Sequence, residues 1–522
     1  MEFTPVDVGF WSVVPPLFAI ALALITKEVI VSLFLGIICG VMIYVVGSGE
    51  NLTAIFHTTT DLIVKKVGDN AAMVIFLAML GAVVALIARA GGAKAYGVWA
   101  VSKLKKRQSS TFLTAILGIL IFIDDYFNCL TVGTVMKPVT DRFKVSREKL
   151  AYLIDSTAAP ICVIAPISSW AAAVVSYAPF VNGMSGMKAF VMAIPINLYA
   201  VLTIFMVIVI SLRKKGDFGP MLRAELRAKA ENVMSDGDIS QNDDIARLKA
   251  SEDGKVIDLV LPVIALIVFC VIAMLFYGGF WDGTSKSIRD SFADTDAGHA
   301  LSLGGILTIL ACFALYMPRK LISFKDFFAA ITDGVKAMVP AMVILTLAWT
   351  ISGVCKEMLA TGIFVAEVVQ GTSLIPLIPL FLFLCACGIS FATGTSWGTF
   401  GILIPISVDI CNRLSPELSL TCLAAVMGGG VFGDHCSPIS DSTILSSTGA
   451  GCKHIDHIAT QIPYALTTAS ACIVGYVIAG FVTGPLGFAK GTAVSLFVSA
   501  AILIALLIVL PKISHKNEQS IE

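Results

Sequence analysis

The segment GDHCSPISDSTI, Gly433–Ile444, places two carboxylates, one imidazole and four hydroxyl groups inside a very apolar chain. Three more aspartates have apolar surroundings: Asp124 and Asp125 in IDDYFNC, and Asp155 in IDSTAAP. In a bilayer, each ionised carboxylate near the centre costs about 3 kcal/mol on insertion scales. Packing does not explain that cost, so these side chains are candidates for binding or moving ions. The alternative is that some are protonated structural groups or lie nearer the interface.

Helix-breaking residues accompany these carboxylates. Pro166 follows Asp155, and Gly433 and Pro438 flank Asp434; such residues interrupt helical hydrogen bonds and free carbonyl oxygens. Carbonyls, hydroxyls and carboxylates are oxygen ligands, which hard cations prefer. The predicted ion- and proton-binding residues are Asp124, Asp125, Asp155, Asp434 and Asp441, with Na+ held through Asp155, Asp434 and Asp441. The predicted supporting polar residues are Ser156, Thr157, Ser168, Ser169, Thr393, Thr395, Ser396, His435, Ser437, Ser440, Ser442 and Thr443. For any single Ser or Thr, the alternative is a hydrogen bond back to its own helix.

These groups predict a simple exchange chemistry. Burial disfavours a charged carboxylate and a bound Na+ favours it, so H+ and Na+ compete for the same group. If only a loaded site crosses the membrane, each cycle trades one ion for the other. His435, next to Asp434, is a candidate proton relay, because histidine titrates near neutral pH. A neutral, hydrogen-bonded histidine in a packed turn fits equally well.

The composition indicates that membrane helices position these residues. Of the 522 residues, 57% are hydrophobic and 14% are charged, and the mean hydropathy is +0.89. Apolar runs of about 20 residues recur, long enough to cross a hydrocarbon layer of about 30 Å. They predict an all-α polytopic protein of the cell (inner) membrane with about 11 crossings. The runs are Phe10–Thr26, Glu28–Val46, Ala71–Ala90, Lys149–Ala178, Met187–Leu212, Val256–Tyr277, His299–Tyr316, Val335–Cys355, Ser415–Ser447, Ala459–Val482 and Phe488–Leu510.

Three basic loops mark the predicted cytoplasmic side: Lys103–Arg107, Lys137–Lys149 and Arg213–Lys215. The first two flank a single apolar stretch, so residues about 109–136 are predicted to form a re-entrant hairpin. A second hairpin is predicted at about 374–408, around the polar SFATGTSWG. Counting crossings places the N-terminus outside and the C-terminus in the cytoplasm.

The two halves of the chain contain similar motifs, PISS at Pro166–Ser169 and PISD at Pro438–Asp441. This predicts two inverted-topology repeats, residues 1–212 and 256–486, each with a hairpin and a discontinuous helix. The broken helices are expected at about 149–178 and 415–447. A polar cytoplasmic linker, 213–255, joins the repeats, and 487–522 adds a helix and tail. Because Pro-Ile-Ser also occurs at Pro405–Ser407, chance similarity is the alternative.

Three runs carry a family resemblance: GDHCSPISDSTILSSTGAG at Gly433–Gly451, IDSTAAPICVIAPISSW at Ile154–Trp170 and PPLFAIALALITKEVIVSLFLG at Pro15–Gly36. They resemble the NhaC-type Na+/H+ antiporter family of a larger ion transporter superfamily, over nearly the whole chain. The resemblance implies two inverted repeats and secondary active transport rather than an enzyme. It does not fix the substrate, because members similar to malate/lactate or basic amino acid exchangers also belong to that family.

We therefore expect Na+/H+ exchange by competition for buried carboxylates. The expected partners are Na+, H+ and the lipid bilayer, with no cofactor and no nucleic acid, and a homodimer is left open. The alternative is an H+- or Na+-linked exchanger of a basic amino acid or small organic acid. A dicarboxylate carrier would need a fixed cation at the site. Apart from Lys149, where the first broken helix begins, neither the hairpin tips nor the broken helices hold Lys or Arg.

Two further alternatives are weaker. An intramembrane aspartyl protease would need Gly-x-Gly-Asp, whereas Gly430 and Gly433 are separated by two residues. The cluster Cys452, His454, Asp456 and His457 has metal-ligating residue types, but a polar loop between two helices explains it as well.

Overall fold

The computed structural model describes the chain except residues 1–2, 27, 105, 231–250, 252, 284–286, 289–290, 292–294, 362, 365–366, 368–373, 439 and 520–522. Nearly all of the described chain is helical. Up to Ala230 the elements are η1 Gly9–Val13, α1 Val14–Thr26, α2 Val29–Gly47, α3 Ala54–Asp69, α4 Ala71–Ala90, α5 Gly92–Lys103, α6 Arg107–Leu120, α7 Asp125–Arg142, α8 Arg147–Cys162, α9 Ser169–Tyr177, β1 Phe180–Val181, β2 Met184–Ser185, α10 Gly186–Ala193, η2 Ile194–Ile196, α11 Leu198–Leu212 and α12 Gly219–Ala230. The strands β1 and β2 form one short antiparallel pair.

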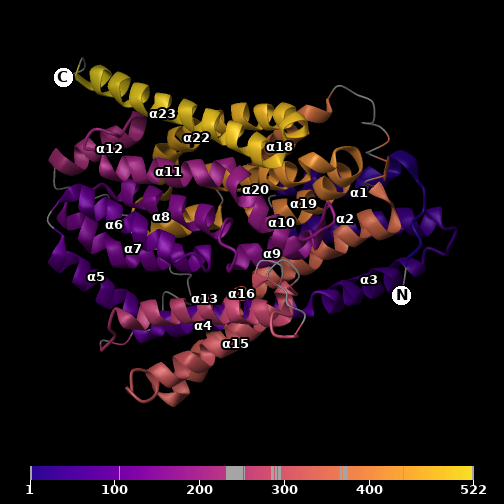
Figure 1. Cartoon of the computed structure of the whole chain (residues 1–522), viewed down its shortest axis with the longest axis horizontal. Coiled ribbons are helices and arrows are strands. Elements are labelled where there is room, and N and C mark those ends of the chain that lie inside the picture. Colours follow the sequence, from indigo (N-terminus) through magenta and orange to yellow (C-terminus); the bar gives the residue numbers. More distant parts are fainter. Residues whose placement is uncertain are drawn as a thin grey trace.

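The rest of the chain adds the helices α13 Ile257–Tyr277, α15 Ala297–Tyr316, α16 Phe324–Gly353, a π turn η3 Val354–Met358, η4 Ile375–Leu377, α18 Ile378–Thr393, α19 Ser396–Leu414, η5 Pro416–Leu418, α20 Ser419–Cys436, α21 Asp441–Ala450, α22 His454–Leu486 and α23 Phe488–Gln519. Most long helices run along the longest axis of the molecule, and the two termini lie at opposite ends of it (Figure 1). Helices α4, α13, α15 and α16 pack together along one edge.

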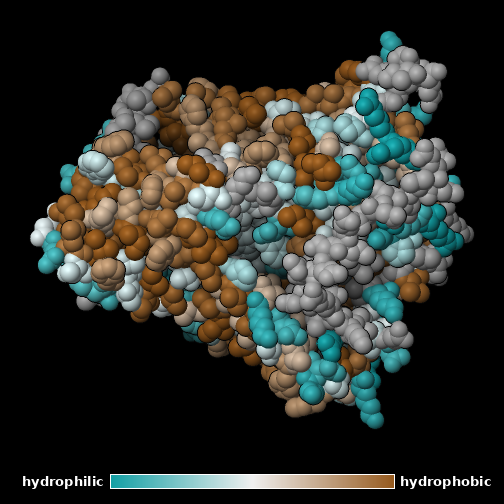
Figure 2. Space-filling view, turned by 180° about the vertical axis from the view of Figure 1, so that it is seen from behind, coloured by the Kyte–Doolittle hydropathy of each residue, from teal (hydrophilic) through white to brown (hydrophobic). Residues whose placement is uncertain are grey.

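The helices confirm an all-α polytopic membrane protein. Among the described residues, nine helices are long and apolar enough to span a bilayer, or ten if the pair Gly186–Ile196 and Leu198–Leu212, bent by 50°, is one span. The predicted number was about 11. Three predicted runs are not single spans: Phe10–Thr26 holds only a shorter apolar helix, Lys149–Ala178 is divided between α8 and α9, and Met187–Leu212 contains the bent pair. One of the nine, Ile375–Thr393, lies instead in the predicted second hairpin. Figure 2 shows hydrophobic surface over much of one face, with hydrophilic residues gathered toward the end that holds the C-terminus.

Two helical hairpins enter the molecule from opposite ends. In the first, α6 and α7 are antiparallel neighbours, and Arg107 at its open end donates to the Lys144 carbonyl at 3.4 Å. Nearby, Arg147 donates to the Gly451 carbonyl at 3.0 Å, just before α22 begins. In the second, α18 and α19 meet at Gly394, whose φ of 68° suits glycine. Its open end, η4 and η5, packs on the last turns of α22. A 33-residue helix is about 50 Å long, so the hairpins open far apart.

Each hairpin tip meets a break in a helix. Residues 163–168 separate α8 from α9, and residues 437–440 separate α20 from α21. Both second segments begin with a serine cap: Ser168 accepts from the Ala171 N–H at 3.0 Å, and Ser440 from the Thr443 N–H at 3.3 Å. This arrangement agrees with the expected pattern of hairpin followed by discontinuous helix. The division into inverted repeats at residues 1–212 and 256–486 stays a prediction, and most of the linker lies outside the described residues.

Candidate ion-binding site

Three carboxylates from the two halves of the chain face one small cavity. The cavity is lined by Asp125, Tyr126, Gly394, Thr395, Trp397, Asp434, Asp441 and Ser442. The cavity volume is about 10 Å³. That is about enough for one water molecule or one small ion. The space between the three carboxylates therefore has room for one small ion.

Asp434 is held by hydroxyl groups from two different elements. It lies in the last turn of α20 with only 4% of its surface exposed. Ser440, from the break after α20, donates to Oδ1 at 2.6 Å, and Ser396, at the tip of the second hairpin, donates to Oδ2 at 3.1 Å. Both donors sit where a helix begins, because the chain has just reversed or broken there. They orient the carboxylate and stabilise its charged form.

The two aspartates of the first hairpin differ in their surroundings. Asp124 caps α7, because its Oδ1 accepts from the Phe127 N–H at 3.0 Å, and its Oδ2 accepts from Ser169 at 3.1 Å. Asp125, the first residue of α7, accepts from the indole of Trp170 at 2.9 Å. Both are 2% exposed. Asp125 lines the cavity, whereas Asp124 belongs mainly to the cap.

Asp441 lies on the open side of the cavity. It is exposed, it begins α21, and it accepts from the Tyr126 hydroxyl at 3.3 Å. The positive ends of α7 and α21 therefore lie beside Asp125 and Asp441 and stabilise their negative charge. Three carboxylates around one small space still repel one another, and a bound cation or proton relieves that repulsion.

The predicted supporting residues divide into two groups. Thr395 and Ser442 line the cavity, Ser396 and Ser440 bind Asp434, and Thr443 donates to the Asp434 carbonyl at 3.2 Å. The others are held elsewhere. Thr157, Thr393 and Ser168 donate to backbone carbonyls, Ser169 donates to Asp124, and His435 bonds with Tyr199. Ser156 is buried in α8, and Ser437 begins the second break. The back-bonding alternative thus applies to Thr157 and Thr393.

Asp155 does not line this cavity. It is fully buried in α8, where Ser446 donates to Oδ1 at 3.2 Å and Gln461 donates to Oδ2 at 2.5 Å. His457 places its Nε2 3.5 Å from the same oxygen. We therefore revise the expectation that Asp155 shares one Na+ site with Asp434 and Asp441. Sequence reasoning missed Gln461 and His457 as partners, although their four-residue spacing puts them on one face of a helix.

The suggested metal cluster is not assembled. His454 bonds with Ser447 and with the Pro438 carbonyl, whereas His457 turns to Asp155. No group of three or more His, Cys, Asp or Glu side chains in the described part of the chain is arranged to hold a metal ion.

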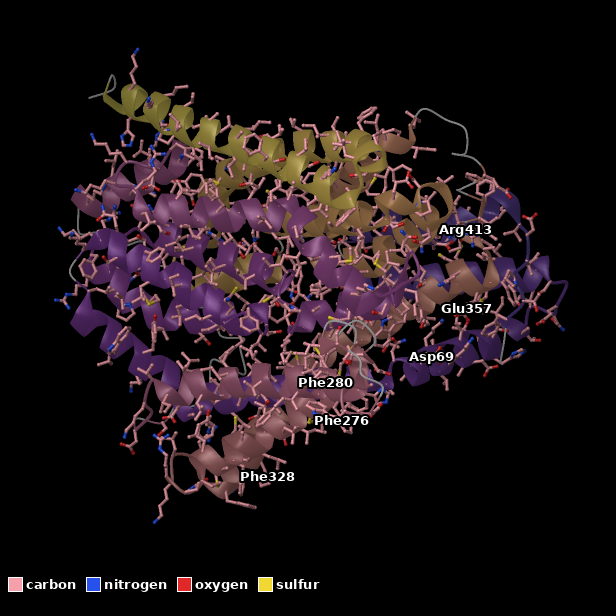
Figure 3. The ribbon with its side chains drawn as sticks, in the orientation of Figure 1. Asp69, Phe276, Phe280, Phe328, Glu357 and Arg413 are labelled. Atoms are coloured by element: carbon pink, nitrogen blue, oxygen red, sulfur yellow. The ribbon has the colours of Figure 1, made fainter. Side chains whose placement is uncertain are left out.

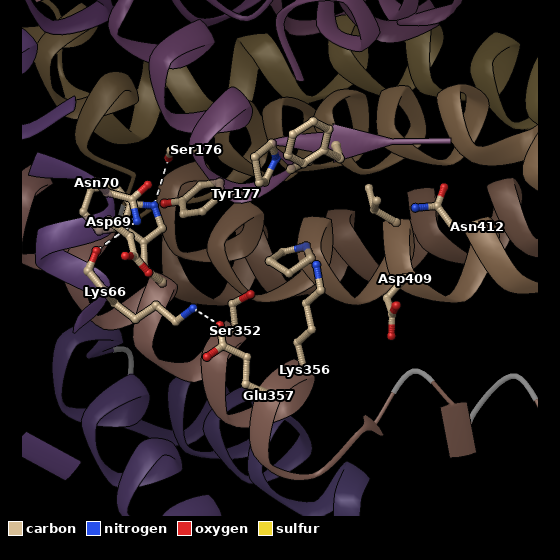
Figure 4. Close-up of a pocket in the computed structure, with 16 residues that line it drawn as sticks. Lys66, Asp69, Asn70, Ser176, Tyr177, Ser352, Lys356, Glu357, Asp409 and Asn412 are labelled. Atoms are coloured by element: carbon tan, nitrogen blue, oxygen red, sulfur yellow. Dashed lines mark hydrogen bonds and ion pairs between the residues drawn. The ribbon is translucent and has the colours of Figure 1, made fainter. Parts of the chain in front are cut away.

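A larger cavity of about 290 Å³ (Figure 4) is lined by residues at the end of the molecule where Figure 1 marks the N-terminus. Figure 3 shows Asp69, Glu357 and Arg413 at that end. Lys65 and Lys66 both pair with Glu357, and the Trp349 indole donates to Ser176 at 2.9 Å. We call this cavity the vestibule. Tyr177 on its wall is the last residue of α9, whose other end carries Trp170 near the Asp434 cavity.

Buried ion pairs gather at the opposite end of the molecule. Lys149 donates to both oxygens of Asp217 at 2.8 Å, and Glu225 lies against Lys149 and Arg107. The Tyr464 hydroxyl also donates to Asp217 at 3.0 Å. Burial acts to raise the pKa of Glu225, but the charges of Lys149 and Arg107 outweigh it, so its pKa is lowered from the ordinary 4.5. We call Arg107, Lys149, Asp217 and Glu225 the ion network.

Comparison with known proteins identifies the family. The model of the Na+/H+ antiporter family matches residues 161–481. The chain is similar to a Haemophilus influenzae protein named only as uncharacterized, with 39% identity over 514 residues, 95% of this chain and 96% of that one. It is 32% identical over 165 residues to the malate-2H+/Na+-lactate antiporter of Bacillus subtilis, covering 30% of this chain and 34% of that protein. It is 30% identical over 177 residues to an uncharacterized Na+/H+ antiporter of Haemophilus influenzae, covering 32% and 37%.

Proposed function

Because this chain belongs to the Na+/H+ antiporter family, we propose that it exchanges Na+ for H+ at the cavity formed by Asp125, Asp434 and Asp441. The observation that carries the proposal is the meeting of these three carboxylates around a space for one small ion. They come from the first hairpin and the second broken helix, so a bound ion links the two halves of the chain.

The exchange follows from charge balance at Asp434. When Asp434 holds a proton it is neutral, and Ser440 or Ser396 can turn its hydroxyl to accept rather than donate. When the proton leaves, both hydroxyls donate to the carboxylate, and Na+ takes the free oxygen positions beside it. Na+ and H+ each reduce the negative charge of the cavity, and neither binds well while the other is there.

The positions of the basic residues support an orientation in the membrane. Arg107, Lys149 and Arg227 lie in the ion network or beside it, at the end where the first hairpin opens. Basic residues near membrane helices favour the cytoplasm. We therefore place this end and the C-terminus in the cytoplasm, and the vestibule and the N-terminus outside.

Alternating access would follow from the two hairpins. Because they enter from opposite ends and both tips reach the broken helices, moving one hairpin with its helix would close one route and open the other. The proposed inverted repeats would supply two nearly equivalent arrangements for this change.

A second candidate, transport of a small organic acid or basic amino acid with the same ions, has one observation in its favour. The vestibule is large enough for such a solute, and it offers the Lys356 ammonium and the Asp69 carboxylate, neither of which has an ion-pair partner among the described residues. The hydroxyl of buried Tyr177 likewise makes no hydrogen bond within the described chain. The similarity to a malate-2H+/Na+-lactate antiporter agrees with this candidate.

One assay separates the two candidates. The purified protein is reconstituted in vesicles with an internal pH indicator and an imposed pH gradient, and Na+, Li+, K+, lysine, arginine or malate is added separately. Dissipation of the gradient by Na+ alone supports Na+/H+ exchange, and the Asp434→Asn variant should remove it while Asp296→Asn, an exposed cap of α15, keeps it. A response that needs an organic solute supports the second candidate.

A further inference from the structure

Asp155 occupies a second polar site that the proposed exchange does not use. It is 0% exposed and is reached by side chains from two other helices: Ser446 of α21, and Gln461 and His457 of α22. A fully buried carboxylate needs either a proton or a positive partner nearby. His457 is the group in contact with Asp155 that can supply either.

His457 is itself poorly satisfied as a neutral side chain. It is 0% exposed, and neither ring nitrogen makes a hydrogen bond within the described chain. Buried polar atoms normally have partners, and exceptions call for an explanation. A proton on the imidazole turns both nitrogens into donors, and Nε2 already lies 3.5 Å from Asp155 Oδ2. In this geometry, adding a proton to the His457 imidazole would turn its contact with Asp155 into an ion pair.

This pair is separate from the cation cavity but connected to it. The Gln461 amide donates to Asp155 at 2.5 Å and also to the His435 carbonyl at 2.8 Å. His435 follows Asp434 directly, and its ring bonds with the Tyr199 hydroxyl at 3.0 Å. Because Gln461 binds both groups, a movement of the last turn of α20 at Asp434 would also move Gln461, which is a hydrogen-bond partner of Asp155.

The pair also lies close to the end of the molecule with the ion network. His457 is in the first turn of α22, and Arg147 at the start of α8 holds the Gly451 carbonyl just before this helix. Asp155 lies two turns further along α8. Protons from that end would meet His457 before they meet Asp434.

The titratable groups around the pair come from several helices. Within electrostatic range of Asp155 are His457 of α22, His435, Cys436 and the cavity carboxylate Asp434 of α20, and Cys129 of α7. His435 and His457 also interact electrostatically with each other. Tyr199 of α11 bonds to His435, and α21 contributes the hydroxyl of Ser446. No Lys or Arg is among these neighbours, so a charged His457 would balance Asp155.

We propose that His457 and Asp155 form a proton-binding pair separate from the cation cavity. This inference rests on the proposed exchange function. A proton from the cytoplasmic end binds the His457 imidazole or the Asp155 carboxylate, and it leaves the pair when α20 and Gln461 move during the transport cycle. Each cycle then moves one proton more than the number displaced by Na+ in the cavity.

The test uses reconstituted full-length protein with His457→Gln, and with Asp155→Asn as the second variant because it keeps the side-chain volume. His299→Gln, an exposed histidine in the first turn of α15, is the matched control. Two readouts are needed: the pH profile of Na+-dependent proton flux, and the Na+ and H+ gradients at which net flux is zero, which give the number of protons per Na+. Na+ binding itself is followed by the rise in Tm that Na+ causes in the purified protein.

The proposal predicts that His457→Gln or Asp155→Asn lowers the proton count by one per Na+ and shifts the pH profile by about one unit. The Na+-induced rise in Tm should persist. His299→Gln should match the wild type in every readout. Wild-type proton count and pH profile in a folded His457→Gln or Asp155→Asn protein would overturn the pair. Failure of the exchange function itself looks different, because the wild type would then show no Na+-dependent proton flux.

Discussion

In each half of the molecule, a hydrogen bond between a serine and an aspartate connects the hairpin tip to the broken helix, and the two residue types trade places between the halves. We call this connection the joint. In the first half, an aspartate at the hairpin tip, Asp124, accepts from a serine at the start of the second helix segment, Ser169, at 3.1 Å. In the second half, a serine at the hairpin tip, Ser396, donates to an aspartate before the break, Asp434, also at 3.1 Å. Each half thus ties its hairpin tip to its broken helix by one hydroxyl–carboxylate bond.

The difference lies in what else each carboxylate does. Asp124 also accepts from the Phe127 N–H and so caps α7. Asp434 accepts from a second hydroxyl, Ser440, and lines the cavity. A backbone N–H can only donate, so it favours the charged form, whereas a hydroxyl can donate or accept and tolerates a change of protonation. We infer that the first joint is structural and that the second is the exchange site.

The largest expected effect separates these two aspartates directly. Asp434→Asn should abolish Na+-dependent proton flux, because the amide neither titrates nor balances the charge of Na+. Asp124→Asn should retain most of the flux, since asparagine is nearly as good a helix cap as aspartate. Flux in reconstituted vesicles and the Tm of both variants are the measurements. Equal loss in two folded variants would remove the distinction between the joints.

A smaller effect is expected at Asp125, which brings the first half into the cavity. Asp125→Asn removes one of three negative charges but keeps an acceptor for the Trp170 indole. The apparent Na+ affinity should fall by roughly tenfold, about 1.4 kcal/mol, with the maximal flux little changed. The Na+ dependence of proton flux at fixed pH measures this. Unchanged Na+ dependence would place Asp125 outside the ion site.

The two serines provide a matched pair with a subtler readout. Ser396→Ala removes a donor that favours the charged form of Asp434, so Asp434 should hold its proton to higher pH. The pH profile of exchange should therefore shift toward alkaline pH, by about one unit for a bond of about 1.4 kcal/mol. Ser169→Ala should lower stability without this shift. A similar alkaline shift in Ser169→Ala would mean that Asp124 also exchanges protons.

The smallest effect is expected on stability, at the ion network beside the open end of the first hairpin. The lowered pKa of Glu225 means that its charged form stabilises the fold above its ordinary value of 4.5, and that this contribution is lost as pH falls below 4.5 through the lowered pKa. Glu225→Gln should destabilise the protein by about 1–3 kcal/mol at neutral pH and by progressively less in acid. Tm measured from neutral to acidic pH checks this, and a pH-independent difference would contradict it.

Some of this arrangement was predictable from local sequence. Polar residues within apolar runs, together with Pro and Gly, predicted where hairpin tips and helix breaks would lie. A local pattern does not give the distance of each aspartate from the break in its helix. Asp434 lies two residues before the end of α20, whereas Asp155 lies seven before the end of α8. At 1.5 Å per residue, that difference of five residues is about 7.5 Å. This offset places Asp155 beside His457 rather than in the cavity.

Partners supplied by distant segments were also beyond sequence reasoning. Gln461 reaches Asp155 across 306 positions, and Tyr126 reaches Asp441 across 315. The vestibule is assembled from side chains of four separate stretches, represented by Lys66, Ser176, Glu357 and Asp409. Such sites depend on how the helices pack, which hydrophobic periodicity does not specify.

The competition between Na+ and H+ at Asp434 is tested most directly by proton release from the purified protein. Na+ is added to protein in weakly buffered detergent solution containing a pH indicator, and the protons released per protein are measured over a range of pH. The account predicts release that is largest where Asp434 is still protonated, that declines at higher pH, and that is absent in Asp434→Asn, with choline as the inactive control cation. Undiminished release from a folded Asp434→Asn protein would contradict exchange at this carboxylate.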